Sequence, residues 1–271
     1  MLWEKIIRQN QHALTVGALH PIPTTCEYLQ NSGINFIVRI SNNLERKKIS
    51  TLKQEQKNIN PFLPYEEDLF VENLSDTHVC LLNKFNVVDH HILIITKAFE
   101  RQDTLLTLQD FIALWICLSQ VDGLAFYNGG KLAGASQHHK HLQLIPLSPS
   151  AIPVTEVIES TFTQGGLARS PVFPFVHAIV HYDLEKSSVP SAILARSYQT
   201  LLDVAGCGLA YNLLITKTWM LLVPRRKEKS LEISLNSLGF AGCFFVSNKE
   251  YFKKLAHHGP LNLLADVSYS L

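Results

Sequence analysis

The sequence predicts an α+β protein, and the order of its strand and helix patterns carries this prediction. Apolar runs rich in β-branched residues recur in closely spaced pairs, at 78–97 and at 210–225. Apolar residues at helical spacing mark two helices, at Leu108–Leu118 and Ala192–Ala205. A strand, a glycine-rich loop and a second strand at 124–146 indicate a hairpin.

The first half of the chain begins with a helix over residues 1–20, where apolar residues recur at roughly helical spacing until two prolines follow. Asn35–Ile40 is predicted to be a strand because β-branched and aromatic residues dominate it. The nearly continuous apolar runs His78–Lys84 and His90–Lys97 are typical of strands buried on both faces. The helix that begins after Thr107 carries a wide apolar face and is expected to lie on the sheet.

The second half repeats this kind of pattern. Val176–Tyr182 is a predicted strand, and after the helix come two apolar strands, Ala210–Lys217 and Trp219–Arg225. An Ile-Thr-Lys run occurs at 95–97 and again at 215–217, which is consistent with two related halves.

The main division is expected in a segment rich in Ser, Pro and Gly. Residues 1–147 form an N-terminal part that carries the histidine motif, and 148–175 form a linker or flexible excursion. Residues 176–271 form a C-terminal part that completes the site.

Composition excludes several classes of protein. Hydrophobic residues make up 46% of the 271 residues and charged residues 17%, so the chain can bury a core and lacks the signature of disorder. A net charge of +1 provides no general field for nucleic acid or an acidic membrane surface. The five cysteines are scattered without a C-x-x-C pair, which favours a reducing cytoplasm over a disulfide scaffold. We expect no signal peptide and no transmembrane helix.

The stretch 128–146 has the features of a functional site. Its first half is rich in glycine, and in its second half Gln137, His139, His141 and Gln143 occupy alternate positions. On a strand this alternation directs all four polar side chains to one face and leaves leucines on the other.

Three chemistries use a His-x-His pattern on a strand. Metal ligation would ordinarily add a carboxylate, but no Asp or Glu lies between Asp122 and Glu156. A purely structural role would bury a costly number of polar groups without purpose. Nucleophilic catalysis at phosphorus needs a neutral imidazole in a fixed tautomer and hydrogen-bond donors for the phosphate oxygens. The polar row and the loop supply these groups, so we favour the third chemistry.

The same residues carry a family resemblance. Asn128–Gly130, Gly134–Gln137 and His139–Gln143 resemble the signature of the diadenosine tetraphosphate (Ap4A) phosphorylases, also called ATP adenylyltransferases, in the histidine-triad superfamily. In that branch a glutamine replaces the third histidine, as Gln143 does here. Segments near 83–94, 211–224 and 236–242 also resemble the family, so the resemblance covers most of the chain. It implies an antiparallel sheet with packed helices, like that of histidine-triad proteins and galactose-1-phosphate uridylyltransferases.

The activity implied by the resemblance is phosphorolysis of Ap4A to ATP and ADP, and the reverse reaction. His141 would be the nucleophile, His139 would orient it, and Gln143 would contact the transferred phosphate. Because glutamine cannot act as an acid, the leaving group should need little protonation. A polyphosphate bound to magnesium meets that need, and no protein-bound zinc is expected.

The resemblance also implies a set of substrate-binding residues. Backbone N–H groups of a glycine-rich loop, with a serine hydroxyl, can cradle phosphate oxygens. Lysines would contact the polyphosphate as point charges, and the segment 236–238 would contact the second nucleotide. The residues concerned are Lys47 (preferred to Lys48), Asn83, Lys84, Asn128, Gly134, Ala135, Ser136, Gln137, Asn236, Ser237 and Leu238.

Three positions depart from the family pattern. His138 stands where proline is common, and Cys243 and Ser247 stand where relatives tend to carry Met and Lys, which leaves the preferred polyphosphate length open. A dinucleoside polyphosphate hydrolase, a sugar-1-phosphate nucleotidylyltransferase and a non-catalytic nucleotide-binding protein remain alternatives. The sequence does not predict the oligomeric state or the physiological direction.

Overall fold

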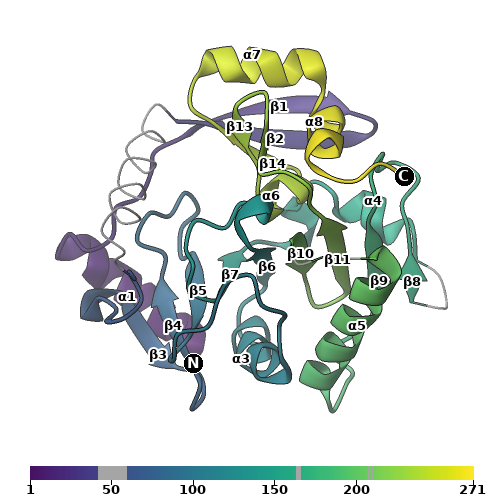
Figure 1. Ribbon diagram of the computed structural model, residues 1–271. Coiled ribbons are helices and arrows are strands. Elements are labelled where there is room, and N and C mark those ends of the chain that lie inside the picture. The colour runs from purple at the N-terminus through teal and green to yellow at the C-terminus, as the bar shows by residue number, and fades with distance from the viewer. Residues whose placement is uncertain (42–59, 163–165, 207, 209) are drawn as a thin grey trace.

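The computed structural model describes residues 1–41, 60–162, 166–206, 208 and 210–271. Its centre is a nine-stranded sheet in the order β3-β4-β5-β7-β6-β10-β11-β9-β8, in which every neighbouring pair is antiparallel (Figure 1). These strands are β3 (Phe70–Asn73), β4 (His78–Leu82), β5 (Ile92–Thr96), β6 (Gly123–Gly129), β7 (His141–Pro146), β8 (Leu167–Ala168), β9 (Ala178–His181), β10 (Tyr211–Ile215) and β11 (Trp219–Pro224).

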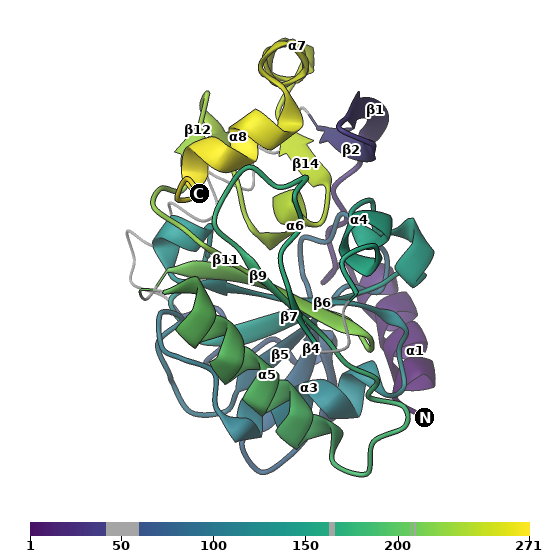
Figure 2. The same ribbon diagram turned by 90° about the vertical axis from the view of Figure 1, so that its right-hand side faces the viewer.

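Three helices cover one face of this sheet, as Figure 2 shows for α3 and α5. They are α1 (Leu2–Thr15), α3 (Leu108–Leu118) and α5 (Pro190–Ala205). Their apolar faces pack on strand residues that point toward them, including Leu142 and Leu144 of β7. Thr107 caps α3 as predicted, because its side chain accepts a hydrogen bond from the N–H of Asp110.

The opposite face is covered by segments from both ends of the chain. A three-stranded sheet of β1 (Thr25–Asn31), β2 (Ile34–Ile40) and β14 (Cys243–Val246) lies beside the last two helices (Figure 1). In it β14 runs parallel to β2. The remaining elements are α4 (Thr155–Glu159), α6 (Ser237–Phe240), α7 (Lys249–His258), α8 (Pro260–Val267), β12 (Lys229–Ser230), β13 (Ile233–Ser234) and the short 3₁₀ turns at 67–69, 131–133 and 149–151.

Two units of the large sheet share one topology. The first runs β5–α3–β6–β7 with the strand order β6-β7-β5, and the second runs β9–α5–β10–β11 with the order β10-β11-β9. They meet where β6 pairs with β10. The Ile-Thr-Lys runs do not mark this relationship, because one ends β5 and the other ends β10, which are not equivalent strands. The α+β class with a large antiparallel sheet and packed helices is confirmed.

Most of the predicted elements are present, with some shifted ends. The histidine strand begins at His141, so Gln137 and His139 precede it, and His139 forms only an isolated bridge with Arg101. The sheet is continuous across the proposed division of the chain, and the segment 148–175 contains α4 and buried side chains such as Ile158 and Phe173. Its role as a linker stays a prediction. In the part of the chain that the structure describes, no helix has the length and apolar character to cross a membrane.

Candidate active site

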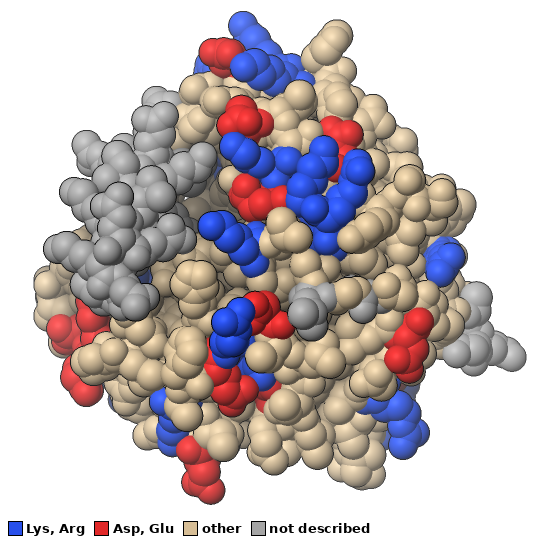
Figure 3. Space-filling model, in the orientation of Figure 1, with Lys and Arg blue, Asp and Glu red and all other residues tan. Residues whose placement is uncertain are grey.

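A cavity of about 680 Å³ lies on the face of the sheet opposite α3 and α5. Its floor is formed by β4, β5, β6 and β7, and its walls come from the loop after β6 and from residues 232–236, 238 and 245–247. His141 and Gln143 of β7 both line it. Basic and acidic side chains are interspersed over the surface drawn in Figure 3, in keeping with the small net charge.

The tautomer of His141 is fixed by its own chain. Nδ1 lies 2.8 Å from the carbonyl oxygen of His139, and because a carbonyl only accepts, Nδ1 must carry the proton. Nε2 therefore holds a lone pair, and it has no hydrogen-bond partner among the described residues. His141 thus presents an unprotonated ring nitrogen in a residue that lines the cavity.

Burial keeps this imidazole neutral. The side chain is only 4% exposed, and desolvation lowers the pKa of His141 to about 4, although its hydrogen bond to the His139 carbonyl acts in the opposite direction. A neutral imidazole is the nucleophilic form, so His141 is competent to attack throughout the physiological pH range.

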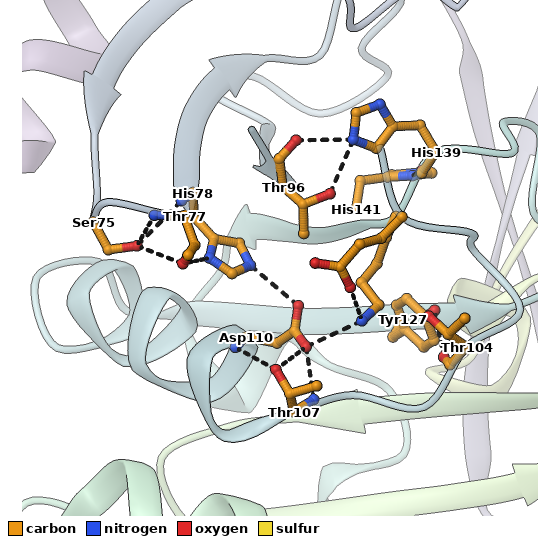
Figure 4. Close-up of polar contacts among 12 residues, drawn as sticks. Ser75, Thr77, His78, Thr96, Thr104, Thr107, Asp110, Tyr127, His139 and His141 are labelled. Atoms are coloured by element: carbon orange, nitrogen blue, oxygen red, sulfur yellow. Dashed lines mark hydrogen bonds and ion pairs between the residues drawn. The ribbon is translucent and has the colours of Figure 1, made fainter. Parts of the chain in front are cut away.

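The His139 side chain is held away from the reacting position. Its Nε2 donates to the carbonyl oxygen of Thr96 at 2.8 Å (Figure 4). Its Nδ1 lies 3.0 Å from the amide nitrogen of Asn60. Burial lowers its pKa, and it is not among the residues that line the cavity. Its predicted role of orienting His141 is consistent with the hydrogen bond that its carbonyl accepts.

A buried ionic group lies on the helix side of the same segment. Lys140 is 1% exposed and contacts Asp110 at the start of α3 at 3.3 Å and Glu100 at 2.7 Å. Burial would raise the pKa of Asp110, but hydrogen bonds from His78 and Thr107 and the charge of Lys140 hold it below its usual value (Figure 4). This group anchors the chain immediately before His141.

Gln143 is oriented by a relay of side chains. The Asn83 Oδ1 accepts the N–H of Phe85, so the Asn83 amide nitrogen faces Nδ1 of His91 at 3.1 Å and donates to it. Nε2 of His91 must then carry a proton and donate to Oε1 of Gln143 at 3.0 Å. The Gln143 NH₂ group is left to donate hydrogen bonds toward the cavity that this residue lines.

The glycine loop provides a second set of donors. Gly134 cannot carry a side chain, because a Cβ would lie 2.3 Å from the carbonyl oxygen of Leu235 and its φ is +83°. The N–H groups of Gly134 and Ala135 bond within the loop, to Lys131 and Gly130. By contrast, the N–H groups of the next two residues, 136 and 137, have no hydrogen-bond partner in the described part of the chain.

Asn128 is held by the C-terminal unit. Its Oδ1 accepts hydrogen bonds from the Asn212 amide at 2.9 Å and from the N–H and hydroxyl of Ser237 at 2.9 and 2.8 Å. Asn212 is held in turn by buried Arg225. Because the Asn128 oxygen is occupied, only its NH₂ group is available to a ligand in the cavity.

The other predicted contact residues are distributed around this network. Asn236 and Leu238 line the cavity, and the Asn236 side chain caps α6 by accepting the N–H of Leu238 at 3.0 Å. Ser237 is fully buried and does not line it. Lys84 lines the cavity as an ion pair with Glu66, at 2.6 Å. Lys47 lies outside the described residues.

Sequence reasoning assigned no role to His91, Asn212 and Arg225. Each is a polar side chain within or beside an apolar strand, and each is at least 92% buried. That placement was the available signal, because a polar group is buried only where partners satisfy it. Among the described residues, no three His, Cys, Asp or Glu side chains are grouped as a metal site.

An antiparallel α+β fold with a His-x-His-x-Gln segment beside a glycine loop defines the histidine-triad class. Within that class, residues 1–160 match the Ap4A phosphorylase N-terminal domain and residues 171–270 match the ATP adenylyltransferase C-terminal domain. The chain therefore belongs to the Ap4A phosphorylase/ATP adenylyltransferase family.

Individual relatives agree with this placement. The chain is 29% identical over 254 residues to diadenosine 5',5'''-P1,P4-tetraphosphate phosphorylase 2 of Saccharomyces cerevisiae, covering 80% of this chain and 78% of that protein. It is similar in structure to yeast Ap4A phosphorylase Apa2 in complex with Ap4A, with a TM-score of 0.86, 25% identity, and coverage of 99% of this chain and 97% of that one. The complex of Apa2 with AMP gives a TM-score of 0.84 at 26% identity, with the same coverage.

Proposed function

We propose that this protein is an ATP adenylyltransferase that cleaves Ap4A by phosphorolysis, giving ATP and ADP. Membership of the family supports the reaction, and the yeast relative named as an Ap4A phosphorylase aligns over most of both chains. The observation that carries the proposal is His141, whose Nδ1–H bond to its own chain leaves Nε2 unprotonated in the cavity wall.

In the first step, Nε2 of His141 attacks the α-phosphorus of one AMP unit. An N–P bond forms, the bond from phosphorus to the bridging oxygen breaks, and ATP leaves with the electron pair. The NH₂ groups of Gln143 and Asn128 would donate hydrogen bonds to the reacting phosphate, since both residues line the same cavity as His141.

In the second step, an oxygen of inorganic phosphate attacks the same phosphorus. The N–P bond breaks, ADP leaves and His141 regains its neutral form. The proton stays on Nδ1 throughout and is donated in a hydrogen bond to the His139 carbonyl oxygen at 2.8 Å. This acceptor stabilises the positive charge that develops on the adenylylated ring.

The polyphosphate is expected to enter as its magnesium complex, which is the substrate form that needs little protonation of the leaving ATP. Its oxygens would meet the free N–H groups of Ser136 and Gln137. They would also compete with Glu66 for Lys84, since that ion pair is exposed enough to exchange partners.

The test uses the purified chain with Ap4A and magnesium, with and without phosphate, and identifies products by chromatography. ATP plus ADP formed only with phosphate supports phosphorolysis. ATP plus AMP formed without phosphate would instead identify a hydrolase. Binding of Ap4A without turnover under either condition would contradict an enzymatic function.

A further inference from the structure

The β6–β7 hairpin opens at the proposed nucleophile. Its register runs from Gly123↔Pro146 to Phe126↔Gln143, and two more residues in the same register would place Asn128 opposite His141. The pairing stops before that point, although β6 continues to Gly129 and remains paired with β10.

The side-chain amide of Gln102 fills the opening. Its Oε1 accepts the N–H of His141 at 2.8 Å, and its Nε2 donates to the carbonyl oxygen of Asn128 at 2.9 Å. In an ordinary ladder the N–H of one of these residues would bond directly to the carbonyl of the other. One amide group is therefore inserted into that hydrogen bond, and its Nε2 also donates to the His141 carbonyl at 3.2 Å.

Gln102 is itself held by burial of its side chain and by hydrogen bonds of its main chain. Its side chain is 97% buried, its backbone N–H donates to the carbonyl of His138 at 2.8 Å, and its carbonyl accepts from the hydroxyl of Tyr127. Beside it, the N–H of Lys140 donates to the carbonyl of Glu100 at 2.8 Å. The main chain that carries the inserted amide is therefore held in place by hydrogen bonds to the segment just before His141.

The opening separates two parts of the proposed site. On one side, the chain leaves β6 at Gly129 to form the loop whose residues line the cavity. On the other, β7 begins with His141. A closed ladder would hold the start of the loop directly against the histidine, whereas the inserted amide sets a fixed gap between them.

We propose that Gln102 is a positioning residue for the reaction, which fixes the main chain of His141 relative to the start of the glycine loop. It does not line the cavity, so it acts through His141 and not on the substrate. This inference rests on the proposed function for its kinetic readout, and a second readout is independent of any reaction.

The variant Q102M keeps the length of the side chain and removes its three hydrogen bonds to the hairpin. A displacement of about 1 Å at a reacting group can reduce the rate on the order of 10²-fold. We expect the single-turnover rate of His141 adenylylation and kcat to fall by about that factor, while KM stays within about threefold. Q120M is the control, because Gln120 also bonds main-chain groups, those of Leu2 and Ile116, but neither of these belongs to the β6–β7 hairpin.

The independent readout is amide hydrogen exchange by NMR. The N–H of His141 should lose protection at least tenfold in Q102M, whereas the N–H groups of Leu142 and Leu144 should be unaffected. A merely structural role would move all three amides together. Unchanged kcat in folded Q102M, or unchanged His141 exchange, would overturn the proposal. If the wild type formed no adenylylated His141, the proposed function would fail, and the exchange result alone would decide whether Gln102 holds this residue.

Discussion

The two hairpins of the large sheet, β6–β7 and β10–β11, hold equivalent places in units of the same topology but differ in how they end. The second hairpin stays paired up to its turn, with Ile215 opposite Met220. The first loses its pairing beyond Phe126 and Gln143, and a connection of more than ten residues leaves the sheet.

Strand register identifies the matching positions. In the first unit His141 pairs with Ile95 of β5, and in the second Trp219 pairs with His181 of β9. By the same register, Leu221 occupies the place of Gln143. Trp219 and Leu221 are buried in the apolar cluster that also contains residues of the small sheet, so the face that is a cavity in one unit is filled in the other.

The histidines that precede β5 and β9 differ in the same sense. His91 donates to Gln143 at the cavity, whereas His177 is fully buried and uses both ring nitrogens on the main chain, at the Phe175 carbonyl and the Ser170 N–H. A repeated topology therefore does not by itself make a site. The first unit forms a candidate site because its β6–β7 hairpin is open and the face of its strands that lines the cavity carries polar side chains.

The largest loss of activity is expected at His141, where the equivalent residue of the second unit is Trp219. Replacing His141 by Ala removes the nucleophile, so turnover of Ap4A should fall by about 10⁴-fold or more. No adenylylated protein should be detected by mass spectrometry. H138A is the control and should keep full activity, because His138 is exposed in the same stretch. A labelled adduct that persists in H141A would contradict the assignment of the nucleophile.

The substitution Q143L gives the first unit the residue found at the equivalent position of the second. It removes the NH₂ donors and the acceptor for His91 while keeping a side chain of similar size. Removal of one donor to a developing charge typically costs about 10² to 10³-fold in kcat, and we expect a loss of that size in steady-state kinetics. A kcat within about threefold of wild type would show that Gln143 does not contact the transferred phosphate.

Of the two equivalent positions, only His141 can take up a proton. Its pKa of about 4 in the folded state lies below the ordinary value of 6.5, so the unfolded chain binds a proton first as the pH falls. Stability should therefore decrease from pH 6.5 toward pH 4, by roughly 3 kcal/mol from this residue. Urea denaturation should show a smaller decrease for H141Q over the same range. An equal decrease in both proteins would contradict the depressed pKa.

Local patterns accounted for much of the fold. The cap of α3 depends on Thr107 and Asp110, three residues apart, and the strands of both units carry continuous apolar runs. The small sheet was not predicted, because β1 is mostly exposed and β14 pairs with β2 from about two hundred residues away. Pairing between such distant segments depends on the assembled core and not on local propensity.

In the candidate site, too, features within one short segment could be predicted and contacts between distant segments were not. His141 and Gln143 could be predicted because their alternation lies within one short strand. The roles of Gln102 and His91 were not predicted, since each acts through a hydrogen bond to a residue about forty or more positions away. Asn236 was predicted as a nucleotide contact, and the structure adds that its side chain caps α6.

The smallest effect on activity is expected in the filled unit. The indole N–H of Trp219 is buried without a hydrogen-bond partner among the described residues, and such a group costs about 1 to 3 kcal/mol. W219F removes it but also removes packed ring atoms, so unfolding free energy should change by less than about 1.5 kcal/mol in either direction. W219A should instead cost about 3 to 5 kcal/mol, because it leaves a cavity. Below the melting temperature, W219F should keep kcat and KM within about twofold, since Trp219 does not line the cavity. A larger loss of kcat in folded W219F would mean that packing around Trp219 in the β10–β11 hairpin affects the geometry of the β6–β7 hairpin.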